Sequence, residues 1–363
     1  MRVPSTMRAA VYRGVNDLRM ETVPVPEIEA GELLVKVATC GICGTDLKKI
    51  HTGSHSAPRI FGHEMAGTVV ATGAGVSRFR AGDRVVVHHH VPCGDCYYCR
   101  KQVPAQCAVY KKVGATAGFE PSGGGFAEYI RVMNWIVARG GVVPIPDGVP
   151  FEQAAFMEPV NTVLQGVKRL NLAADETALV IGQGPIGLML AALARRTGAR
   201  VLTSDLYAER HRIAAKFGLR EPIDAGREDV VERVFKATEG RGADAVILAV
   251  GANVLIGTAM KAARPGGRVM LFAQTQHGEA VFDPGAVCMD EKTLLGSYSA
   301  SFTIIEEVKS LVLDGLRQGF DWTQLISHRF PLEEAVEAIE LASHPRAESM
   351  KIMIEPVANG GRG

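Results

Sequence analysis

The sequence lacks a strong charge bias. Its 40 Lys and Arg residues nearly balance 39 Asp and Glu residues, so the formal net charge is +1. No basic tail or stripe stands out along the chain. Proteins that bind nucleic acid or an anionic membrane surface through charge usually show such a basic patch. We therefore expect neither nucleic acid nor a membrane among the partners of this chain.

The sequence also lacks a long uninterrupted hydrophobic run and a signal peptide. Its longest apolar segment is broken by glycine and proline and carries two charges, at Gly182, Gly184, Pro185, Gly187, Arg195 and Arg196. A membrane-spanning helix needs about 20 predominantly apolar residues. The first seven residues have no apolar core of the kind that signal peptides contain. These absences predict a cytoplasmic protein, in which thiols stay reduced.

Cysteine is scarce, but its distribution is uneven. Four of the seven cysteines follow a C-x2-C-x2-C-x7-C spacing, as Cys93, Cys96, Cys99 and Cys107. Thiolates at such spacing can converge on one tetrahedral Zn²⁺ ion, with Zn–S distances of about 2.3 Å. A disulfide-linked surface loop is the alternative, although nothing else in the chain indicates export. We predict a structural zinc site in which four thiolates occupy every coordination position, so that no position is open to another ligand.

The pattern of apolar residues along the chain predicts an α/β protein with two domains. Short β-branched runs separated by glycine and proline fill roughly the first 150 residues, including Leu33–Thr39, Gly67–Ala71 and Arg84–His88. From Thr177 onward, apolar strands alternate with helical segments, which is typical of a parallel sheet covered on both faces. We expect a β-rich domain from residues 1–157 and 298–363, with a doubly wound parallel-sheet (Rossmann) domain from 158–297 inserted in it.

A glycine-rich turn follows the first strand of the predicted parallel sheet. Its residues are Gly182, Gln183, Gly184, Pro185, Ile186 and Gly187, and they open a helix. The first glycine permits a tight turn, the second lets the backbone approach a pyrophosphate, and the third allows close helix–strand packing. Asp205 ends the next strand, where a carboxylate binds ribose hydroxyls and repels a 2′-phosphate. We predict NAD rather than NADP, although Arg210 nearby could blur that choice; a packing turn without ligand is the alternative.

A second set of potential metal ligands precedes the four cysteines. Cys43 and His63 suit a zinc site that keeps one position open for substrate. Glu64 and Glu158 could add carboxylate ligands, directly or through water. Cys40 and Cys43 also form a CxxC pair, but no thioredoxin-like context surrounds it, so we interpret Cys40 as a packed strand residue.

The evidence that the other histidines belong to a metal or active site is weaker. His88, His89 and His90 are consecutive, and alternate strand residues face opposite sides, so the three cannot all bind one ion. We interpret them as a strand end beside the segment 93–107 that carries the four cysteines, which we call the zinc lobe. His51 and His55 follow Lys48 in what we predict to be a loop, and they are further candidates for the active site.

Taken together, these motifs resemble the zinc-dependent medium-chain alcohol dehydrogenases, in the branch that contains polyol (sorbitol-like) and threonine dehydrogenases. The resemblance covers nearly the whole chain. Its motifs are Gly41-Ile-Cys43-Gly-Thr45-Asp46, Gly62-His63-Glu64, the four cysteines, Met157-Glu158-Pro159 and Gly182-Gln-Gly184-Pro-Ile-Gly187. It implies a GroES-like catalytic domain, a Rossmann domain and an active site between them. It also implies an alcohol as substrate and a dimer or tetramer as the assembly.

The resemblance assigns roles to several residues. It implies that Cys43 and His63 bind a catalytic zinc, and that Glu64 is a carboxylate that ligates zinc or exchanges with water. Glu158 matches the glutamate that this branch carries in place of a third cysteine ligand. Thr45 matches the hydroxyl that takes the substrate proton, and Asp46 matches a supporting partner of the metal site.

The sequence departs from this family at two places, one that bears on the proton relay beyond Thr45 and one that bears on the substrate. Lys48 stands where many relatives carry a histidine for proton exit, and the segment Gly296–Ser301 lacks the arginine that contacts the polyol in sorbitol dehydrogenases. We therefore expect a secondary alcohol that is smaller than sorbitol or a differently substituted sugar. L-Threonine 3-dehydrogenase is the nearest enzymatic alternative. A non-catalytic NAD- and zinc-binding protein is the alternative of another class, but Cys43, His63 and Thr45 are all retained.

Overall fold

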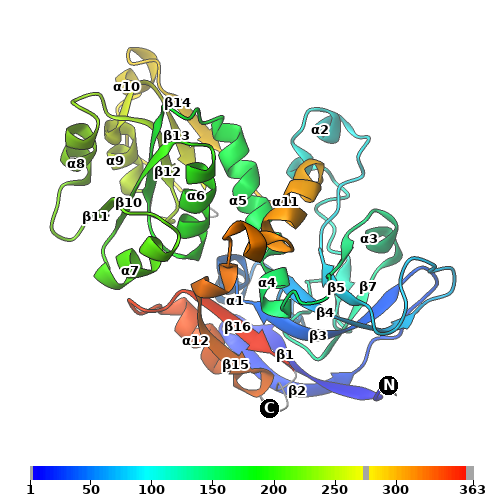
Figure 1. Ribbon diagram of the computed structural model, residues 1–363. Coiled ribbons are helices and arrows are strands. Elements are labelled where there is room, and N and C mark those ends of the chain that lie inside the picture. Colours follow the sequence, from blue (N-terminus) through cyan, green and yellow to red (C-terminus); the bar gives the residue numbers. More distant parts are fainter. Residues whose placement is uncertain (1–2, 273–277, 357–363) are drawn as a thin grey trace. The chain divides into compact units, whose positions relative to one another are not determined.

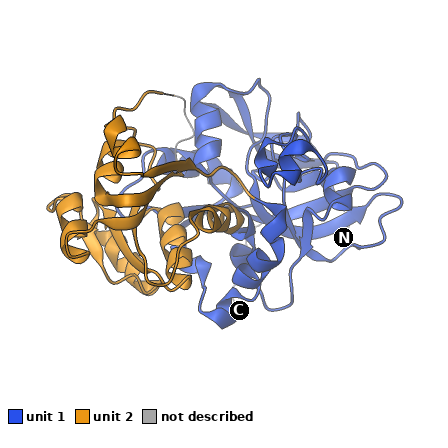
Figure 2. Ribbon diagram, turned by 90° about the horizontal axis from the view of Figure 1, so that it is seen from above, with its two compact units in different colours: residues 1–158, 301–363 blue, residues 159–300 orange. Residues whose placement is uncertain are grey.

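The protein is described by a computed structural model that covers residues 3–272 and 278–356 (Figure 1). The chain forms two compact units (Figure 2). Unit 1 comprises Met1–Glu158 and Ser301–Gly363, and unit 2 comprises Pro159–Ala300. Unit 2 is therefore inserted into the sequence of unit 1.

Unit 1 is built on a largely antiparallel eight-stranded sheet. Its path runs β15-β16-β3-β4-β5-β8, and β7 joins β3 and β6. The strands are β3 (Leu33–Gly41), β4 (Glu64–Thr72), β5 (Arg84–Val87), β6 (Ala115–Thr116), β7 (Tyr129–Val132), β8 (Val142–Pro144), β15 (Ile326–Pro331) and β16 (Lys351–Glu355). A separate hairpin pairs β1 (Thr6–Gly14) with β2 (Asp17–Pro24). The C-terminal strand β16 pairs with β3, so both ends of the chain contribute to this unit.

Short helices surround the sheet of unit 1. They are α1 (Gly44–Thr52), α2 (Tyr97–Arg100), α3 (Asn134–Ala138), α4 (Phe151–Ala155), α11 (Ile305–Val312) and α12 (Ala335–Ser343). The segment after Lys48 was predicted to be a loop, but α1 continues through it to Thr52, and only the part around His55 lies outside a helix. The helix is followed by Gly53, a glycine with φ +64°. Glycine tolerates this left-handed conformation and commonly ends helices.

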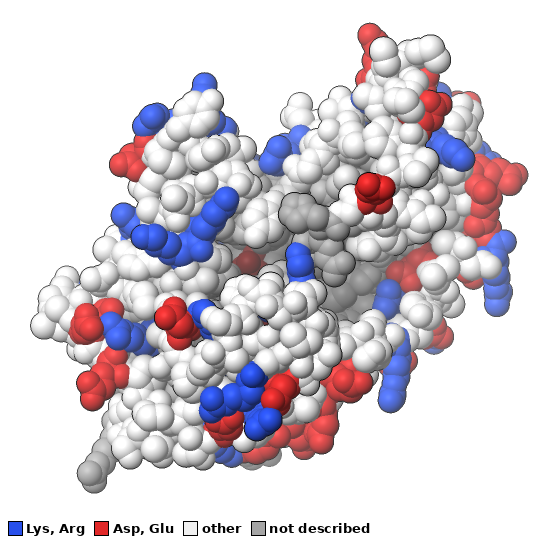
Figure 3. Space-filling model, turned by 180° about the vertical axis from the view of Figure 1, so that it is seen from behind, with Lys and Arg blue, Asp and Glu red and all other residues white. Residues whose placement is uncertain are grey.

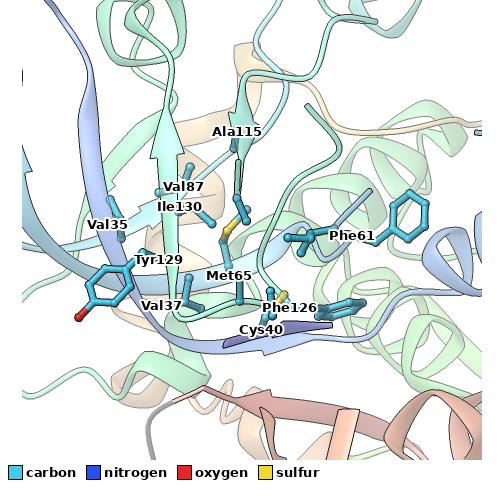
Figure 4. Close-up of a cluster of buried hydrophobic side chains, with 14 of the residues drawn as sticks. Val35, Val37, Cys40, Phe61, Met65, Val87, Ala115, Phe126, Tyr129 and Ile130 are labelled. Carbon is cyan, nitrogen blue, oxygen red and sulfur yellow. The ribbon is translucent and has the colours of Figure 1, made fainter. Parts of the chain in front are cut away.

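The core of unit 1 contains Cys40. Figure 4 shows side chains of β3, β4, β5 and β7 converging on one apolar cluster, with Cys40 beside Met65 and Phe126. Cys40 is fully buried, and burial raises the pKa of its thiol well above the usual value, an effect that Asp46 and Glu64 reinforce. The thiol therefore stays protonated. The prediction that Cys40 is a packed strand residue is confirmed.

Unit 2 is a doubly wound parallel sheet. Its strand order is β11-β10-β9-β12-β13-β14, and every pair is parallel. The strands are β9 (Thr177–Ile181), β10 (Arg200–Asp205), β11 (Pro222–Asp224), β12 (Ala243–Leu248), β13 (Ala263–Leu271) and β14 (Thr293–Gly296). Its helices are α5 (Met157–Leu170), which starts at the end of unit 1, α6 (Pro185–Arg196), α7 (Ala208–Lys216), α8 (Val230–Ala237), α9 (Leu255–Ala262) and α10 (Pro284–Cys288).

The central strands of unit 2 explain why the sequence predicts a parallel sheet. All residues of β9 and of β12 are buried. Strands covered by helices on both faces have no solvent side, so they read as continuous apolar runs rather than as alternating patterns. The predicted combination of a β-rich domain with a doubly wound parallel-sheet domain is confirmed.

The surface matches the balanced composition. On the face that Figure 3 shows, acidic and basic side chains are interspersed among large uncharged areas. Within residues 3–272 and 278–356, no helix has the length and apolar character needed to cross a bilayer.

Candidate functional site

The four predicted cysteines of the zinc lobe converge in space. The distances between sulfur atoms are 3.5 Å for Cys93 and Cys107, 3.6 Å for Cys96 and Cys99, and 3.9 Å for Cys93 and Cys99. Four sulfurs bound tetrahedrally to one zinc at about 2.3 Å would lie about 3.8 Å apart. A disulfide bond requires about 2.05 Å, and all four thiols are free. The arrangement therefore fits a tetrahedral metal site rather than a disulfide-linked loop.

The lobe around these cysteines has a very small core. Its buried members are Ala105, Cys107 and Tyr110, against which the other three cysteines and Val109 pack. Burial would raise the pKa of the Cys107 thiol, but backbone N–H groups of Cys93 and Tyr110 lower it to about 6. Cys107 therefore loses its proton before Cys93 and Cys99, whose pKa values are raised. A core of this size contributes little stability, so a bound metal would supply much of the order of the lobe.

A second group of potential ligands forms where two segments of unit 1 meet. Cys43 occupies the N-cap position of α1, His63 precedes β4, and Glu64 is the first residue of β4. One ligand atom from each lies within 4.8 Å of the other two. His63 and Glu64 are buried, whereas Cys43 is half-buried. Thiolate, imidazole and carboxylate are the ligand set of catalytic zinc sites, which keep a further position for water or substrate.

Asp46 connects the two ligand-bearing segments. Its carboxylate accepts hydrogen bonds from the backbone N–H groups of Cys43 (3.2 Å) and Gly62 (3.3 Å), and from His63 Nδ1 (3.0 Å). Burial alone would raise the pKa of Asp46, but the interaction with His63 lowers it, so the carboxylate is ionised. A proton held on Nδ1 leaves His63 Nε2 as the atom available to a metal.

Asp46→Asn should weaken metal binding at this second group without unfolding the protein. The amide keeps the size of the side chain but loses the charge that orients His63, and loss of such a partner typically lowers metal affinity by about 10–100-fold. Competition with a chromogenic chelator measures the affinity of each bound zinc. Asp17→Asn, at an exposed pair with Arg19, is the control and should leave both affinities unchanged. An unaltered affinity in Asp46→Asn would contradict this role.

Lys351 is a neighbour of the second group that we did not predict from the sequence. It belongs to the last strand, yet its ammonium group is buried, donates to the carbonyl oxygen of Ile42 (2.9 Å) and forms an ion pair with Glu64. A Cβ atom on Gly41 would lie 2.2 Å from Glu64 Oε2 and 2.7 Å from Lys351 Cε, so glycine leaves room for this pair. No motif around Lys351 marks it, and only the pairing of β16 with β3 brings it here.

Glu158 and Thr45 lie on helices that begin near the second group. Glu158 is half-buried near the start of α5, and burial raises the pKa of its carboxyl to about 7, with His63 and Glu64 as electrostatic neighbours. Its oxygens lie outside the 4.8 Å group formed by Cys43, His63 and Glu64. Thr45 is half-buried in the first turn of α1, two residues after Cys43.

The histidines of the chain differ in environment. His88, His89 and His90 directly follow β5, and burial lowers the pKa of each, to about 4 for His88 and His90. His89 and His90 lie between the second group and Tyr110 of the zinc lobe, whereas His88 packs against Phe302.

The expectation that His51 and His55 belong to the active site is not supported by their contacts. Both ring nitrogens of His51 are engaged, with Asn16 (2.6 Å) and Ser343 (2.7 Å). His55 lies against Phe61 and hydrogen-bonds Ser54. In the described part of the chain, the only groups of three or more potential metal ligands are the four cysteines and the Cys43, His63 and Glu64 group.

The glycine-rich turn has the geometry that a dinucleotide needs. Gly182 follows β9 with φ +99°, and a Cβ atom there would lie 2.5 Å from Val250. A Cβ atom on Gly187 would lie 1.8 Å from the carbonyl oxygen of Gly182. Gly184 caps α6, Pro185 and Ile186 form its first positions, and no atom lies within 4 Å of a Cβ built on Gly184. The helix N-terminus is thus open to an anion, as in pyrophosphate sites.

Asp205 lies directly beside this turn at the end of β10. Its carboxylate accepts hydrogen bonds from the backbone N–H groups of Gln183 (2.7 Å) and Tyr207 (3.0 Å), and it pairs with Arg210 (3.2 Å). The guanidinium group of Arg210 also lies over the ring of Tyr207, 4.8 Å from its centroid. The site therefore presents a carboxylate and a cation side by side.

Comparisons with known proteins place both parts of the chain in one family. Residues 29–147 match the family model of the alcohol dehydrogenase GroES-like domain, and residues 185–314 match that of the zinc-binding dehydrogenases. The first match includes Cys43, His63, Glu64 and the four cysteines, and confirms the expected GroES-like fold of that region.

Curated relatives cover nearly the full length of this chain. It is 30% identical to a sorbitol dehydrogenase from Bacillus subtilis over 360 residues, which are 98% of each protein. It is 32% identical to an (R,R)-butanediol dehydrogenase from Neisseria gonorrhoeae, over 96% of this chain and 99% of the relative.

Solved structures extend the likeness to three dimensions. A putative zinc-binding dehydrogenase from Sinorhizobium meliloti 1021 bound to NADP superposes with a TM-score of 0.85 at 30% identity, covering 97% of this chain and all of the other. A protein described as a short chain alcohol dehydrogenase from Escherichia coli CFT073, complexed with the cofactor NADH, gives a TM-score of 0.83 at 26% identity, with 97% of this chain and all of the other covered. The family resemblance noted in the sequence is thus confirmed: this chain belongs to the zinc-type medium-chain alcohol dehydrogenase family and is a zinc-dependent NAD(P) alcohol dehydrogenase.

Proposed function

We propose that the protein uses NAD to oxidise a secondary alcohol of the polyol or sugar-derivative class, or reduces the corresponding ketone with NADH. The observation that carries this proposal is the convergence of Cys43, His63 and Glu64 within 4.8 Å of one another in a member of this family. Its relatives include a sorbitol dehydrogenase and a butanediol dehydrogenase, which act on the alcohols in their names. The four cysteines would hold a second, structural zinc.

In this proposal, each residue in or beside the second group has its own role. Cys43, His63 and either Glu64 or Glu158 would hold the catalytic zinc. A bound zinc would lower the pKa of a hydroxyl ligand well below its usual value, as it lowers that of bound water to about 7, and would so favour deprotonation of the substrate. Thr45 would accept the hydroxyl proton and pass it on, and Asp46 would orient His63. The Glu158 carboxyl, an electrostatic neighbour of His63 and Glu64, would be a further group that could pass this proton on.

Proton transfer through Thr45 is tested with a pair of substitutions. Thr45→Val keeps the shape of the side chain but removes the hydroxyl, so turnover should fall by about 10²–10⁴-fold, the usual contribution of a positioned proton-transfer group. Thr45→Ser keeps the hydroxyl and should retain most of the rate. The bound zinc, measured by atomic absorption, should be the same in both variants. A Thr45→Val enzyme that is as fast as the native one would remove Thr45 from the mechanism.

The coenzyme preference follows from Asp205 in this proposal. One of its carboxylate contacts, with the N–H of Gln183, holds the glycine-rich turn. The same carboxylate would accept the ribose hydroxyls of NAD and repel the 2′-phosphate of NADP. Asp205→Ala should lower the ratio of kcat/KM for NAD to that for NADP by about 10–100-fold, since a hydrogen bond to a charged group contributes about 1.5–3 kcal/mol.

Arg210 supplies the control for the coenzyme experiment. Arg210→Gln removes the cation that would attract a 2′-phosphate, so it should leave NAD use nearly unchanged and lower any residual use of NADP. A native enzyme that already prefers NADP would contradict the role given to Asp205. The relative from Sinorhizobium meliloti 1021, which binds NADP, makes both coenzymes necessary in the assay.

The substrate is identified by following NADH formation with a panel of alcohols. Butanediols, four- to six-carbon polyols, sugar derivatives and L-threonine should be compared at equal concentration. We expect the highest kcat/KM for a secondary alcohol smaller than sorbitol, because no arginine occurs within Gly296–Ser301. Preference for L-threonine would favour the threonine dehydrogenase alternative.

A further inference from the structure

A continuous series of aromatic rings joins the two predicted metal sites of unit 1. His63 and His89 have ring centroids 4.7 Å apart, and His89 and His90 follow at 4.0 Å. His90 is stacked on Tyr110, with centroids 5.1 Å apart and an angle of 28° between the planes. The series begins at a ligand of the proposed catalytic zinc and ends in the small core of the four-cysteine lobe.

Backbone contacts strengthen the same connection. His90 Nδ1 donates a hydrogen bond to the carbonyl oxygen of Lys112 (3.2 Å), and the N–H of Gly114 donates to the carbonyl oxygen of His89 (2.9 Å). The N–H of Lys111 donates to the carbonyl oxygen of Cys107 (3.1 Å). The segment that leaves the last lobe cysteine is thus attached to both histidines, by stacking and by hydrogen bonds.

The orientation of the His63 ring depends on more than its hydrogen bond to Asp46. Asp46 holds Nδ1 and Cys43 is a further side-chain partner, and contacts with the face of the ring oppose its tilt about these bonds. His89 packs against His63 and restricts this tilt, and His90 in turn holds His89 in place. His89 is buried, so its ring has little space in which to move away.

The far end of the series depends on the lobe. Tyr110 is buried among Ala105 and the lobe cysteines, which form too few apolar contacts to order the segment alone. If the lobe becomes disordered on losing its metal, Tyr110 and the carbonyl of Lys112 would leave these positions. His90 would then lose its stacking partner and its hydrogen-bond acceptor together.

We propose that His89, His90 and Tyr110 are positioning residues that couple the four-cysteine site to His63, so that an ordered lobe is needed for tight metal binding at Cys43, His63 and Glu64. This inference rests on the proposed function, because it takes these three residues as the catalytic zinc ligands. It gives the lobe a role in metal retention at the reacting centre, in addition to its local structure.

The test compares variants that remove a ring with variants that keep one. Tyr110→Ala and His90→Ala should each speed the release of the catalytic zinc to a chromogenic chelator by at least about tenfold, the lower end of the effect of losing a supporting partner. Tyr110→Phe keeps the stacked ring and should release this zinc nearly as slowly as the native protein. His88→Phe is the matched control, because His88 packs on Phe302 outside the series.

A spectroscopic measurement separates positioning from a general loss of stability. With Co²⁺ in the catalytic site, the visible absorption bands should shift in Tyr110→Ala, although Tyr110 is not a ligand, and should return in Tyr110→Phe. Unchanged bands together with native release of the catalytic zinc from Tyr110→Ala would overturn the coupling. Cys43→Ala identifies which release phase belongs to the catalytic zinc; if it removes no zinc, the proposed function itself is wrong, so the two failures are distinct.

Discussion

Cys43→Ala is expected to abolish most of the activity and to leave one zinc per chain. Cys43 provides the only thiolate among the three clustered ligands of the second group. The two ligands that remain bind zinc far more weakly than three. The zinc ion, as a Lewis acid, contributes several kcal/mol to lowering the barrier of the reaction. Since each 1.36 kcal/mol corresponds to a factor of ten, turnover should fall by at least about 10³-fold. Metal analysis and steady-state kinetics of the same preparation measure both effects.

Two other cysteines make this experiment specific. Cys288 is exposed, so Cys288→Ala should keep two zinc ions and full activity. Cys40→Ala removes a fully buried sulfur from the core and should lower stability while keeping both metals. A Cys43→Ala protein that still holds two zinc ions would mean that the second group is not a zinc site.

Lys351→Met should destabilise the protein strongly, and zinc should reduce the effect. Lys351 and Glu64 form a buried ion pair in which side-chain exposure is 6% and 2%. Breaking a buried pair by removing one partner typically costs about 3–5 kcal/mol, because the other charge remains uncompensated. We therefore expect the free energy of unfolding of the zinc-free protein to fall by about 3 kcal/mol or more, seen as a lower urea midpoint.

A cation bound near Glu64 would replace part of the lost positive charge. The urea midpoint of Lys351→Met should therefore be closer to the native value in the zinc-loaded protein than in the zinc-free protein. Adding Glu64→Gln should restore stability in the zinc-free state, since it removes the uncompensated charge. Lys309→Met, which breaks an exposed pair with Glu306 on α11, should change stability by at most about 0.5 kcal/mol. Equal losses in the two lysine variants would contradict the role of the buried pair.

The four-cysteine site and the glycine-rich turn were predictable because their information is local. The spacing of Cys93, Cys96, Cys99 and Cys107 brings four thiols together within one short segment. The turn at Gly182–Gly187 needs glycine because of its own positive φ and the close approach of its own backbone. In both cases the residues that interact are neighbours along the chain, so the motif contains most of the geometry.

The second group was only partly predictable. The sequence identified Cys43, His63 and Glu64 as potential ligands, but it did not show that His51 would contact Asn16 and Ser343, which come from other parts of the chain. The sequence also predicted a loop where α1 continues to Thr52. A single histidine in a sequence carries no sign of which side chains will face it.

By itself, the sequence determined the fold class, the potential metal ligands and the family, since these depend on periodicity and on the spacing of reactive residues. The tertiary structure alone decided which groups support the ligands. Lys351 donates to the carbonyl oxygen of Ile42, 309 residues earlier in the sequence. His90 stacks on Tyr110, which comes from beyond the four cysteines. Such contacts depend on strand pairing and on the path of loops, and no local pattern encodes them.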